Sequence, residues 1–262
     1  MNKQLIAEKL NKLQKNDKNQ GSSRAGFFWS PEIGKHDVRI VPRKDSPDDP
    51  FLELFFHKKI SKYSVISLSN FGESDPVELF IKELKKVEKG EEYDPNKWRL
   101  AGSLTPAPRY FVPVIVRGEE EKGVRMWGFG KTVYESLLQM ASDEEIGDFT
   151  DIENGWDMVV TAAQGPKYKE TSVRLKMKQS PLSTDAKQVK KWLVEQPSID
   201  DMFAKPDFDF IKEKLKEYVD SITDKQEEAE EPKTQRPVTL GTQKGGVSAN
   251  KNFNNLFDEE ED

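Results

Sequence analysis

Residues 109–129 read RYFVPVIVRGEEEKGVRMWGF, and this stretch decides the fold class. Two runs rich in β-branched and aromatic residues, 109–116 and 124–129, flank the polar segment GEEEKG at 118–123. Such runs around a short polar connection are typical of two strands joined as a β-hairpin. Pro113 has no amide hydrogen to donate, so it favours an edge strand or a bulge in the first run.

More short strands are predicted on both sides of this hairpin. The candidates are 37–41, 51–57, 60–68, 156–162 and 171–178. The last of these alternates most cleanly, with three apolar residues expected on one face and three cations on the other. The apolar residues are Val173, Leu175 and Met177, and the cations are Arg174, Lys176 and Lys178.

Helices are predicted between and after the strands. Asp75-Pro76 supplies an N-cap and a first-turn proline, and apolar residues then keep helical spacing to about Lys89. Further helices are expected at 131–141, 185–194 and 207–222. This pattern predicts a mainly β member of the α+β class, a small barrel or sandwich with appended helices.

Composition excludes several classes of function. The chain has 262 residues and no cysteine, which rules out disulfides, cysteine nucleophiles and thiolate zinc sites and favours a reducing cytoplasm. No run approaches the roughly 18 apolar residues that a membrane-spanning helix needs. Hydrophobic residues make up 35% of the chain, which suggests one folded domain with polar extensions.

Charge divides unevenly along the chain. Residues 1–24 carry six basic and two acidic side chains, and residues 226–262 carry four basic and nine acidic ones. This asymmetry suggests contact with nucleic acid. The alternative is two solvated, disordered termini without a ligand. We expect a basic arm at 1–24, a folded core at 25–223 and a disordered acidic tail at 224–262.

The N-terminal arm contains a short amphipathic helix. Ile6, Leu10 and Leu13 follow helical spacing, with Leu5 beside them, in a lysine-rich setting. A helix of this length is marginal alone, so we expect it to dock on another surface.

Catalytic motifs are missing from the sequence. Gly128–Thr132 resembles a phosphate loop, but Arg125 stands where the nucleotide-binding pattern needs glycine. Amides at a helix start, together with Lys131, can still hold a phosphate without hydrolysing it. The chain has two histidines, His36 and His57, and neither belongs to a zinc-binding motif. The sequence also lacks the G-x-S-x-G motif of serine hydrolases. A Ser/His/Asp arrangement around His57 stays open, because acidic residues lie near it in the chain. We predict a protein that is not an enzyme and has no cofactor.

Aromatic residues alternate with cations on the predicted strands. Arg125, Trp127 and Phe129 share one face of their strand, and the same mixture recurs at Trp98-Arg99 and Arg109-Tyr110-Phe111. A sequence-tolerant binder of single strands needs such residues, because bases stack on the rings and cations follow the phosphates. The alternative is that the rings form the core and the cations its solvated rim.

The order of several segments resembles the helix-destabilising single-stranded DNA-binding proteins of T-even-type bacteriophages. The similarity is carried by LIAEKLNKLQKN at 5–16, GFFWSPEIGKHDVRIVP at 26–42, FLELFFHKKISKY at 51–63, YFVPVIVRGEEEKGVRMWGFGKTVYESL at 110–137, VRLKMKQS at 173–180, QPSIDDMF at 196–203 and NLFDEEED at 255–262. The resemblance implies an OB-fold, a five-stranded Greek-key-type barrel. It also implies cooperative coating of single-stranded phage DNA during replication, recombination and repair, in the cytoplasm of the infected bacterial host.

Residue roles follow from this resemblance. The expected stacking residues are Trp98, Tyr110, Phe111 and Trp127; the expected phosphate contacts are Arg39, Lys58, Lys59, Arg99, Arg109, Arg125, Lys131, Arg174 and Lys176. Self-association is expected from Lys3, Leu5, Ile6, Lys9, Leu10 and Leu13, and contact with replication and recombination proteins from Phe253, Leu256, Phe257, Asp258, Glu259, Glu260, Glu261 and Asp262.

The chain departs from this family at one place. The family commonly carries a zinc subdomain with one histidine and three cysteines. His57 stands where that histidine is expected, but residues 67–81 contain no cysteine, so we predict no structural metal and a capped helix from Asp75 in its place. Two other functions stay open from the residues themselves: a protein-interaction scaffold and an RNA-binding OB module.

Overall fold

A computed structural model describes residues 26–87, 94–227 and 245–257 of the chain. The chain divides into two compact units. We call residues 1–53 and 108–204 the sheet unit, and residues 54–107 and 205–262 the helical unit. Within the described residues, no helix combines the length and the hydrophobicity needed to cross a membrane.

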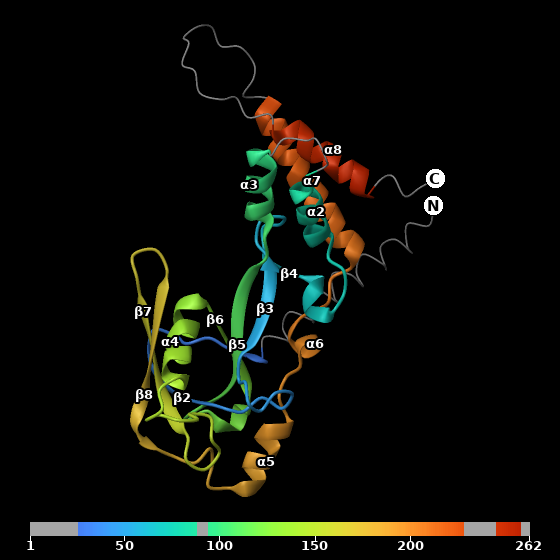
Figure 1. Cartoon of the computed structure of the whole chain (residues 1–262). Coiled ribbons are helices and arrows are strands. Elements are labelled where there is room, and N and C mark those ends of the chain that lie inside the picture. Colours follow the sequence, from blue (N-terminus) through green and yellow to red (C-terminus); the bar gives the residue numbers. More distant parts are fainter. Residues whose placement is uncertain (1–25, 88–93, 228–244, 258–262) are drawn as a thin grey trace, which may run out of the picture. The chain divides into compact units, whose positions relative to one another are not determined.

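Six strands follow one another across the sheet unit in the order β1-β6-β5-β2-β7-β8 (Figure 1). Their bounds are β1 Phe28–Trp29, β2 Gly34–Ile40, β5 Ala107–Val116, β6 Arg125–Phe129, β7 Trp156–Gln164 and β8 Lys169–Gln179. The short 3-10 helix η2, Glu120–Lys122, connects β5 to β6 and confirms the predicted hairpin. β1 is parallel to β6, and the other neighbours along this path are antiparallel.

The sheet is open, which corrects the expected five-stranded Greek-key-type barrel. Along the described strands, β1 and β8 stand at opposite ends of the path and do not pair. β1 is two residues long, so it offers too short an edge for the eleven-residue β8 to complete a ring of strands. The α+β class is confirmed, and the structure shows that the sheet is mixed.

Apolar residues cover both faces of this sheet. Val112 and Val114 of β5 belong to a large core that also contains Val133 and Leu137 of α4, which spans Lys131–Ala141. Ile115 points to the opposite face because side chains alternate along a strand. There it joins a smaller core completed by Val41, Val124, Leu182 and by Trp192 of α5, Ala186–Val194. The interior strands are therefore buried on both sides.

Two local strand predictions were wrong. Pro113 lies in β5, which has neighbours on both sides, rather than on an edge. The β2–β5 pairing ends at Val114, and Pro113 accepts a hydrogen bond from the Val41 amide through its carbonyl, so its missing amide hydrogen is tolerated there. Met177 is 96% exposed although it was expected on the apolar face, because the β7–β8 register shifts between Trp156 and Met158.

The helical unit is built around four helices (Figure 1). These are α2 Pro76–Lys85, α3 Pro95–Leu104, α7 Phe208–Glu227 and α8 Gly245–Phe257. β3 Leu52–His57 pairs with β4 Val65–Ile66. The short 3-10 helix η1, Leu68–Phe71, precedes α2 in the chain. One short helix, α6 Ile199–Met202, belongs to the sheet unit instead. α3 was not predicted, although Asp94-Pro95 repeats the capping signal of Asp75-Pro76.

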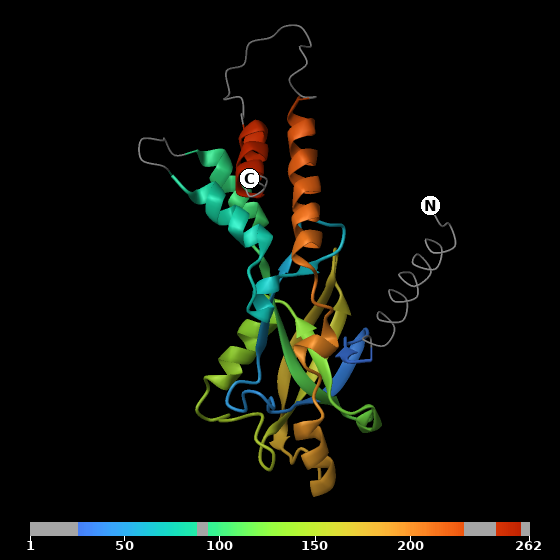
Figure 2. The same ribbon diagram turned by 90° about the vertical axis from the view of Figure 1, so that its right-hand side faces the viewer.

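Helix α8 differs from the expected disorder of residues 224–262. Ala249 and Phe253 are each 1% exposed, and the Phe253 ring lies 5.9 Å from that of Phe80 in α2, centroid to centroid. Figure 2 shows α8 (red) beside the long α7 (orange). Ala249, Phe253 and Leu256 have the spacing of one helix face. The glycines and asparagines around them give the segment the composition of a disordered linker, so the helix was not predicted.

A buried polar cluster connects β3 with the start of α2. The Nε2 atom of His57 lies 2.9 Å from Oδ2 of Asp75, and both residues are at most 2% exposed. Asp75 also accepts hydrogen bonds from the Leu68 amide at 2.9 Å, the Ser67 hydroxyl at 3.0 Å and the Val77 amide at 2.9 Å. The helix cap predicted at Asp75 is confirmed, and it ties β3 to α2.

Acid is expected to destabilise the protein through Asp75. Burial raises the pKa of this carboxyl, but the hydrogen bond and charge of His57 and the bonds from Leu68 and Ser67 outweigh it and lower the pKa. Its contribution is therefore present above pH 3.8, the ordinary value, and is lost as the pH falls through the lower pKa of the folded state. Urea unfolding measures the free energy of unfolding at pH 5 and at pH 3. The decrease between these two pH values should be larger for the wild type than for Asp75→Asn, and equal decreases would contradict the prediction.

Candidate nucleic-acid interface

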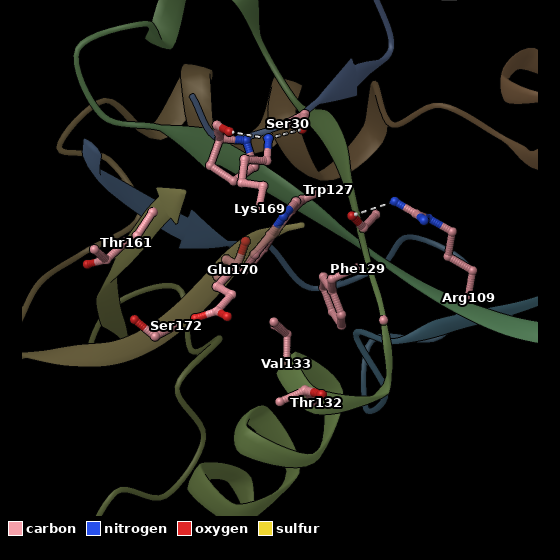
Figure 3. A pocket seen from close by; sticks show the side chains of 15 residues that line it. Ser30, Arg109, Trp127, Phe129, Thr132, Val133, Thr161, Lys169, Glu170 and Ser172 are labelled. Atoms are coloured by element: carbon pink, nitrogen blue, oxygen red, sulfur yellow. Dashed lines mark hydrogen bonds between the residues drawn. The ribbon is translucent and has the colours of Figure 1, made fainter. Parts of the chain in front are cut away.

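A cavity of about 600 Å³ opens on the sheet unit between the β6–α4 junction and the β7–β8 hairpin (Figure 3). One wall is formed by Phe129, Gly130 and Thr132, where β6 ends and α4 begins. The other wall is formed by residues of β7 and β8, among them Thr161 and Ser172. The lining is thus mostly hydroxyls, backbone and apolar surface.

The start of α4 gives the cavity free backbone donors. Gly130 is the N-cap residue and makes no side-chain capping hydrogen bond, because it has no side chain. The first-turn amides of a helix have no partner within the helix, and the helix dipole favours negative charge there. The exposed Thr132 hydroxyl lies in the same wall, and the neighbouring Lys131 side chain is 78% exposed and forms a solvent-exposed ion pair with Glu135 at 3.4 Å. This end of the cavity suits a phosphate.

Two cations stand on the rim of the cavity. Arg109 is exposed on β5 and donates a hydrogen bond to the Gly128 carbonyl at 3.3 Å. Lys169 Nζ lies 2.7 Å from the Pro31 carbonyl and 3.3 Å from the Ser30 hydroxyl (Figure 3). Glu170 is the carboxylate in the lining, so the described rim carries two positive charges and one negative charge.

Gly128 is required by the packing beneath Arg109. A Cβ atom at this position would lie 2.6 Å from Cε1 of the Phe111 ring and 3.3 Å from Nε of Arg109. The absence of a side chain at Gly128 therefore lets the Phe111 ring and the Arg109 side chain pack directly against the backbone of β6.

An exposed aromatic residue stands at the tip of the β7–β8 hairpin, next in the chain to Lys169 of the cavity lining. Tyr168 is 79% exposed and stands between Lys167 and Lys169 in the chain. Tyr168 was not predicted as a stacking residue, because it lies in the turn rather than on a strand. The pattern Lys-Tyr-Lys directly after Gly165-Pro166 was the available signal.

The helical unit carries two further sets of aromatic and basic residues. Tyr63 is 73% exposed with Lys62 Nζ 5.4 Å from its ring centroid, close in the chain to the exposed Lys58 and Lys59. Trp98 is 40% exposed, with Lys85 Nζ 5.6 Å from its ring centroid. Its neighbour in the chain, Arg99, is exposed.

Three of the four expected stacking rings are buried, which corrects their predicted role. Trp127 is 1%, Phe111 3% and Tyr110 8% exposed. Tyr110 stacks on Tyr134 with ring centroids 3.7 Å apart, and burial, followed by nearby Glu53, raises the pKa of Tyr110. β5 and β6 are interior strands with both faces covered, so their alternation does not produce an exposed face.

Arg39 and Arg125 are also buried and cannot serve as open phosphate contacts. Arg39 is fully buried and donates to Asp157 at 3.5 Å and to the Asp151 carbonyl at 2.5 Å. Arg125 is 8% exposed and pairs with Glu119 at 2.6 Å. Lys176 is half-buried and pairs with Asp37 at 2.6 Å. Each of these cations already has an acidic partner.

The remaining predicted residues are distributed as follows. Exposed positions are occupied by Lys58, Lys59, Trp98, Arg99, Arg109, Lys131 and Arg174, of which Arg109 lines the cavity. The arm residues Lys3, Leu5, Ile6, Lys9, Leu10 and Leu13, and the tail residues Asp258, Glu259, Glu260, Glu261 and Asp262, lie outside the described residues. Phe253, Leu256 and Phe257 belong to α8.

The His57 cluster does not form a catalytic triad. The Ser67 hydroxyl lies within hydrogen-bond distance of the carboxylates of Asp75 and Glu78, to either of which it can donate its one hydrogen, rather than of His57, and the Asp75–His57 pair is buried. Over residues 26–87, 94–227 and 245–257, no group of three or more histidine or acidic side chains is placed to hold a metal ion.

Comparison with known proteins gives one result that bears on this site. A family model described as "gp32 DNA binding protein like" matches residues 33–223, more than half of the chain, from β2 into α7. The search of curated proteins found no match. The matched range contains most of the cavity lining, including Arg109, Gly128–Gly130, Thr132, Val133 and Lys169–Ser172. The chain therefore belongs to the gp32-like family of DNA-binding proteins, a membership that supports binding of single-stranded DNA.

Proposed function

We propose that the protein binds single-stranded DNA with little sequence preference, as a non-enzymatic protein of phage DNA replication, recombination and repair. The observation that carries the proposal is the cavity of the sheet unit, with free amides at the start of α4 and Arg109 and Lys169 on its rim. Family membership supports it.

The proposed mechanism separates phosphate binding from base stacking. A backbone phosphate binds at the α4 N-terminus, while Arg109 and Lys131 neutralise neighbouring phosphates. Bases stack on Tyr168 of the sheet unit, because an exposed ring accepts any base. Binding of this kind is tolerant of sequence, since it reads no base edge.

Further parts of the proposal concern the chain ends. Residues 1–24 mediate self-association along the strand and produce cooperative binding. The acidic end, Asp258–Asp262, recruits replication and recombination proteins. The sheet is a member of the OB type in an open form, and the protein works in the cytoplasm of the infected host.

Anisotropy of labelled oligo-dT, titrated over a salt series, tests the central proposal. Strong binding that weakens with salt, and that duplex DNA does not match, supports it. A matched series with oligo-rU separates DNA from RNA. No binding of oligo-dT at low salt would contradict the proposal and favour the protein-interaction scaffold.

Tyr168→Ala is expected to weaken oligo-dT binding by about 1–3 kcal/mol, which is about 5- to 150-fold, because one stacking ring is lost. Tyr168→Phe keeps the ring and should bind nearly as well as the wild type. The anisotropy titration measures both. Equal affinity of Tyr168→Ala and the wild type would remove Tyr168 from the interface.

Arg109→Ala is expected to reduce the dependence of binding on salt. Each lost phosphate contact lowers the slope of log K against log salt by about 0.7 for a single strand. Lys190→Ala, which removes an exposed cation of α5 away from the cavity, is the matched control and should leave the slope unchanged. An unchanged slope for Arg109→Ala would show that this guanidinium does not contact phosphate.

A further inference from the structure

A second cavity of the sheet unit has no role in the proposed DNA binding. Its volume is about 680 Å³, and it lies between η2 on one side and α5 and the start of α6 on the other. Gly26 and Phe27, the first described residues of the chain, form part of its rim.

The charge of this cavity is opposite to what DNA requires. Four carboxylates line it, from Glu120, Glu121, Glu195 and Asp201, against the two ammonium groups of Lys122 and Lys191. The Lys191–Glu195 pair at 3.8 Å offsets one of the four carboxylates, and Lys122 pairs at 3.0 Å with Glu119, outside the lining, so the other three carboxylates set the charge of the cavity. The excess of carboxylates repels phosphate and suits a basic occupant.

The lining also provides apolar surface. Phe27, Val124, Trp192 and Pro197 take part in it, and Trp192 and Val124 belong to the smaller core of the sheet unit. An occupant that fits both properties is an amphipathic helix with an apolar stripe and flanking lysines.

The chain itself contains one segment with these properties. Residues 3–15 combine the stripe of Leu5, Ile6, Leu10 and Leu13 with four lysines and one glutamate. A helix of this length measures about 20 Å, and a flexible link of ten residues, the length of 16–25, has a root-mean-square span of about 16–19 Å. Because the described chain begins at Gly26 on the rim, the segment reaches the cavity of its own chain.

We propose that residues 3–15 dock in this acidic cavity of their own chain when the protein is free of DNA. A short link sets an effective concentration of about millimolar, far above that of a second copy in dilute solution, so docking within one chain is favoured. The inference rests on the proposed self-association: the docked arm is withheld from neighbours, and assembly on DNA transfers it to the next molecule.

Cross-linking of the full-length protein tests this placement directly, because the chain contains no native cysteine. Lys9→Cys combined with Gln188→Cys, treated with a short bis-maleimide, should give an internally linked monomer whose yield is independent of protein concentration. Lys9→Cys combined with Glu144→Cys, on the exposed loop after α4, is the matched control and should give little product. A covalent dimer would place the arm in a second copy, and no product would remove it from the cavity; either result overturns the proposal.

Charge reversal supplies a second test. Adding Glu121→Lys and Glu195→Lys to the cysteine pair should lower the yield about fivefold, since two attractive contacts become repulsive. Reversing the exposed Glu144 and Glu145 should not change the yield. An unaffected yield after the cavity reversal would contradict recognition by charge.

Oligo-dT separates the two proposals. If the yield of the internal cross-link falls on addition of oligo-dT, docking and release on DNA are both supported. If oligo-dT does not bind while the cross-link still forms, the proposed function fails and the docking stands. If oligo-dT binds but no internal cross-link forms, the proposed docking fails and the proposed function stands.

Discussion

Asp157→Asn is expected to lower the free energy of unfolding by about 3–5 kcal/mol, because it removes the charge that two arginines share in the sheet unit. The Asp157 carboxylate lies 3.5 Å from Arg39 and 2.8 Å from Arg117. The Arg39 side chain is fully buried, and that of Arg117 is 21% exposed.

The physical reason is desolvation. Burial lowers the pKa of the Arg39 guanidinium, and the charge of Asp157 opposes that effect. Asn keeps the shape of the side chain but leaves a buried guanidinium without its counter-charge. Arg39 also contacts the Asp151 carbonyl and the Ser180 hydroxyl, so the loop before β7 is expected to loosen as well.

Asp37→Asn is the matched control for this prediction. Asp37 pairs with Lys176 at 2.6 Å, but its side chain is 42% exposed, and exposed pairs contribute about 0–1 kcal/mol. Urea unfolding followed by circular dichroism measures both variants. Equal effects of the two substitutions would show that the Arg39 cluster is not a special contributor to stability.

Phe253→Ala is expected to destabilise the helical unit by about 3–5 kcal/mol, the usual cost of removing a buried aromatic ring. Phe253 is 1% exposed and contacts Phe80 of α2, at 5.9 Å between ring centroids, and Phe257, at 4.9 Å. Truncation leaves a cavity between α8 and the helices that it covers.

The control is Asn254→Ala, on the exposed side of the same helix, which should change stability by less than about 0.5 kcal/mol. Urea unfolding gives the free energies, and limited proteolysis reports release of α8. If Phe253→Ala behaves like Asn254→Ala, α8 contributes nothing to the unit, as expected for a disordered tail.

Local signals in the sequence predicted much of the secondary structure. The hairpin at 109–129, the cap at Asp75 and the amphipathic helix at 131–141 depend on neighbours a few residues apart, and all three are confirmed. Helix α8 was missed because its stripe is short and its glycines and asparagines resemble a linker.

The candidate site was predicted only in part. Arg109 and Lys131 are exposed, as phosphate contacts must be, and their role stays a prediction; Trp127 and Arg125 alternate with apolar residues on a strand that is covered on both faces. Exposed rings were found instead at turns and loops, as for Tyr168 and Tyr63, where a strand-based search does not look.

The sequence by itself determined the α+β class, most helix and strand positions, the resemblance to phage single-stranded DNA-binding proteins and the charge of the two chain ends. Periodicity and capping are local, and charge needs no fold. Only the tertiary structure decided which aromatic and basic side chains remain accessible, that the sheet stays open, and that α8 belongs to a core. The burial of a side chain depends on which segments, distant in the chain, pack against each face of the sheet. Local patterns of residues do not reveal which segments those are.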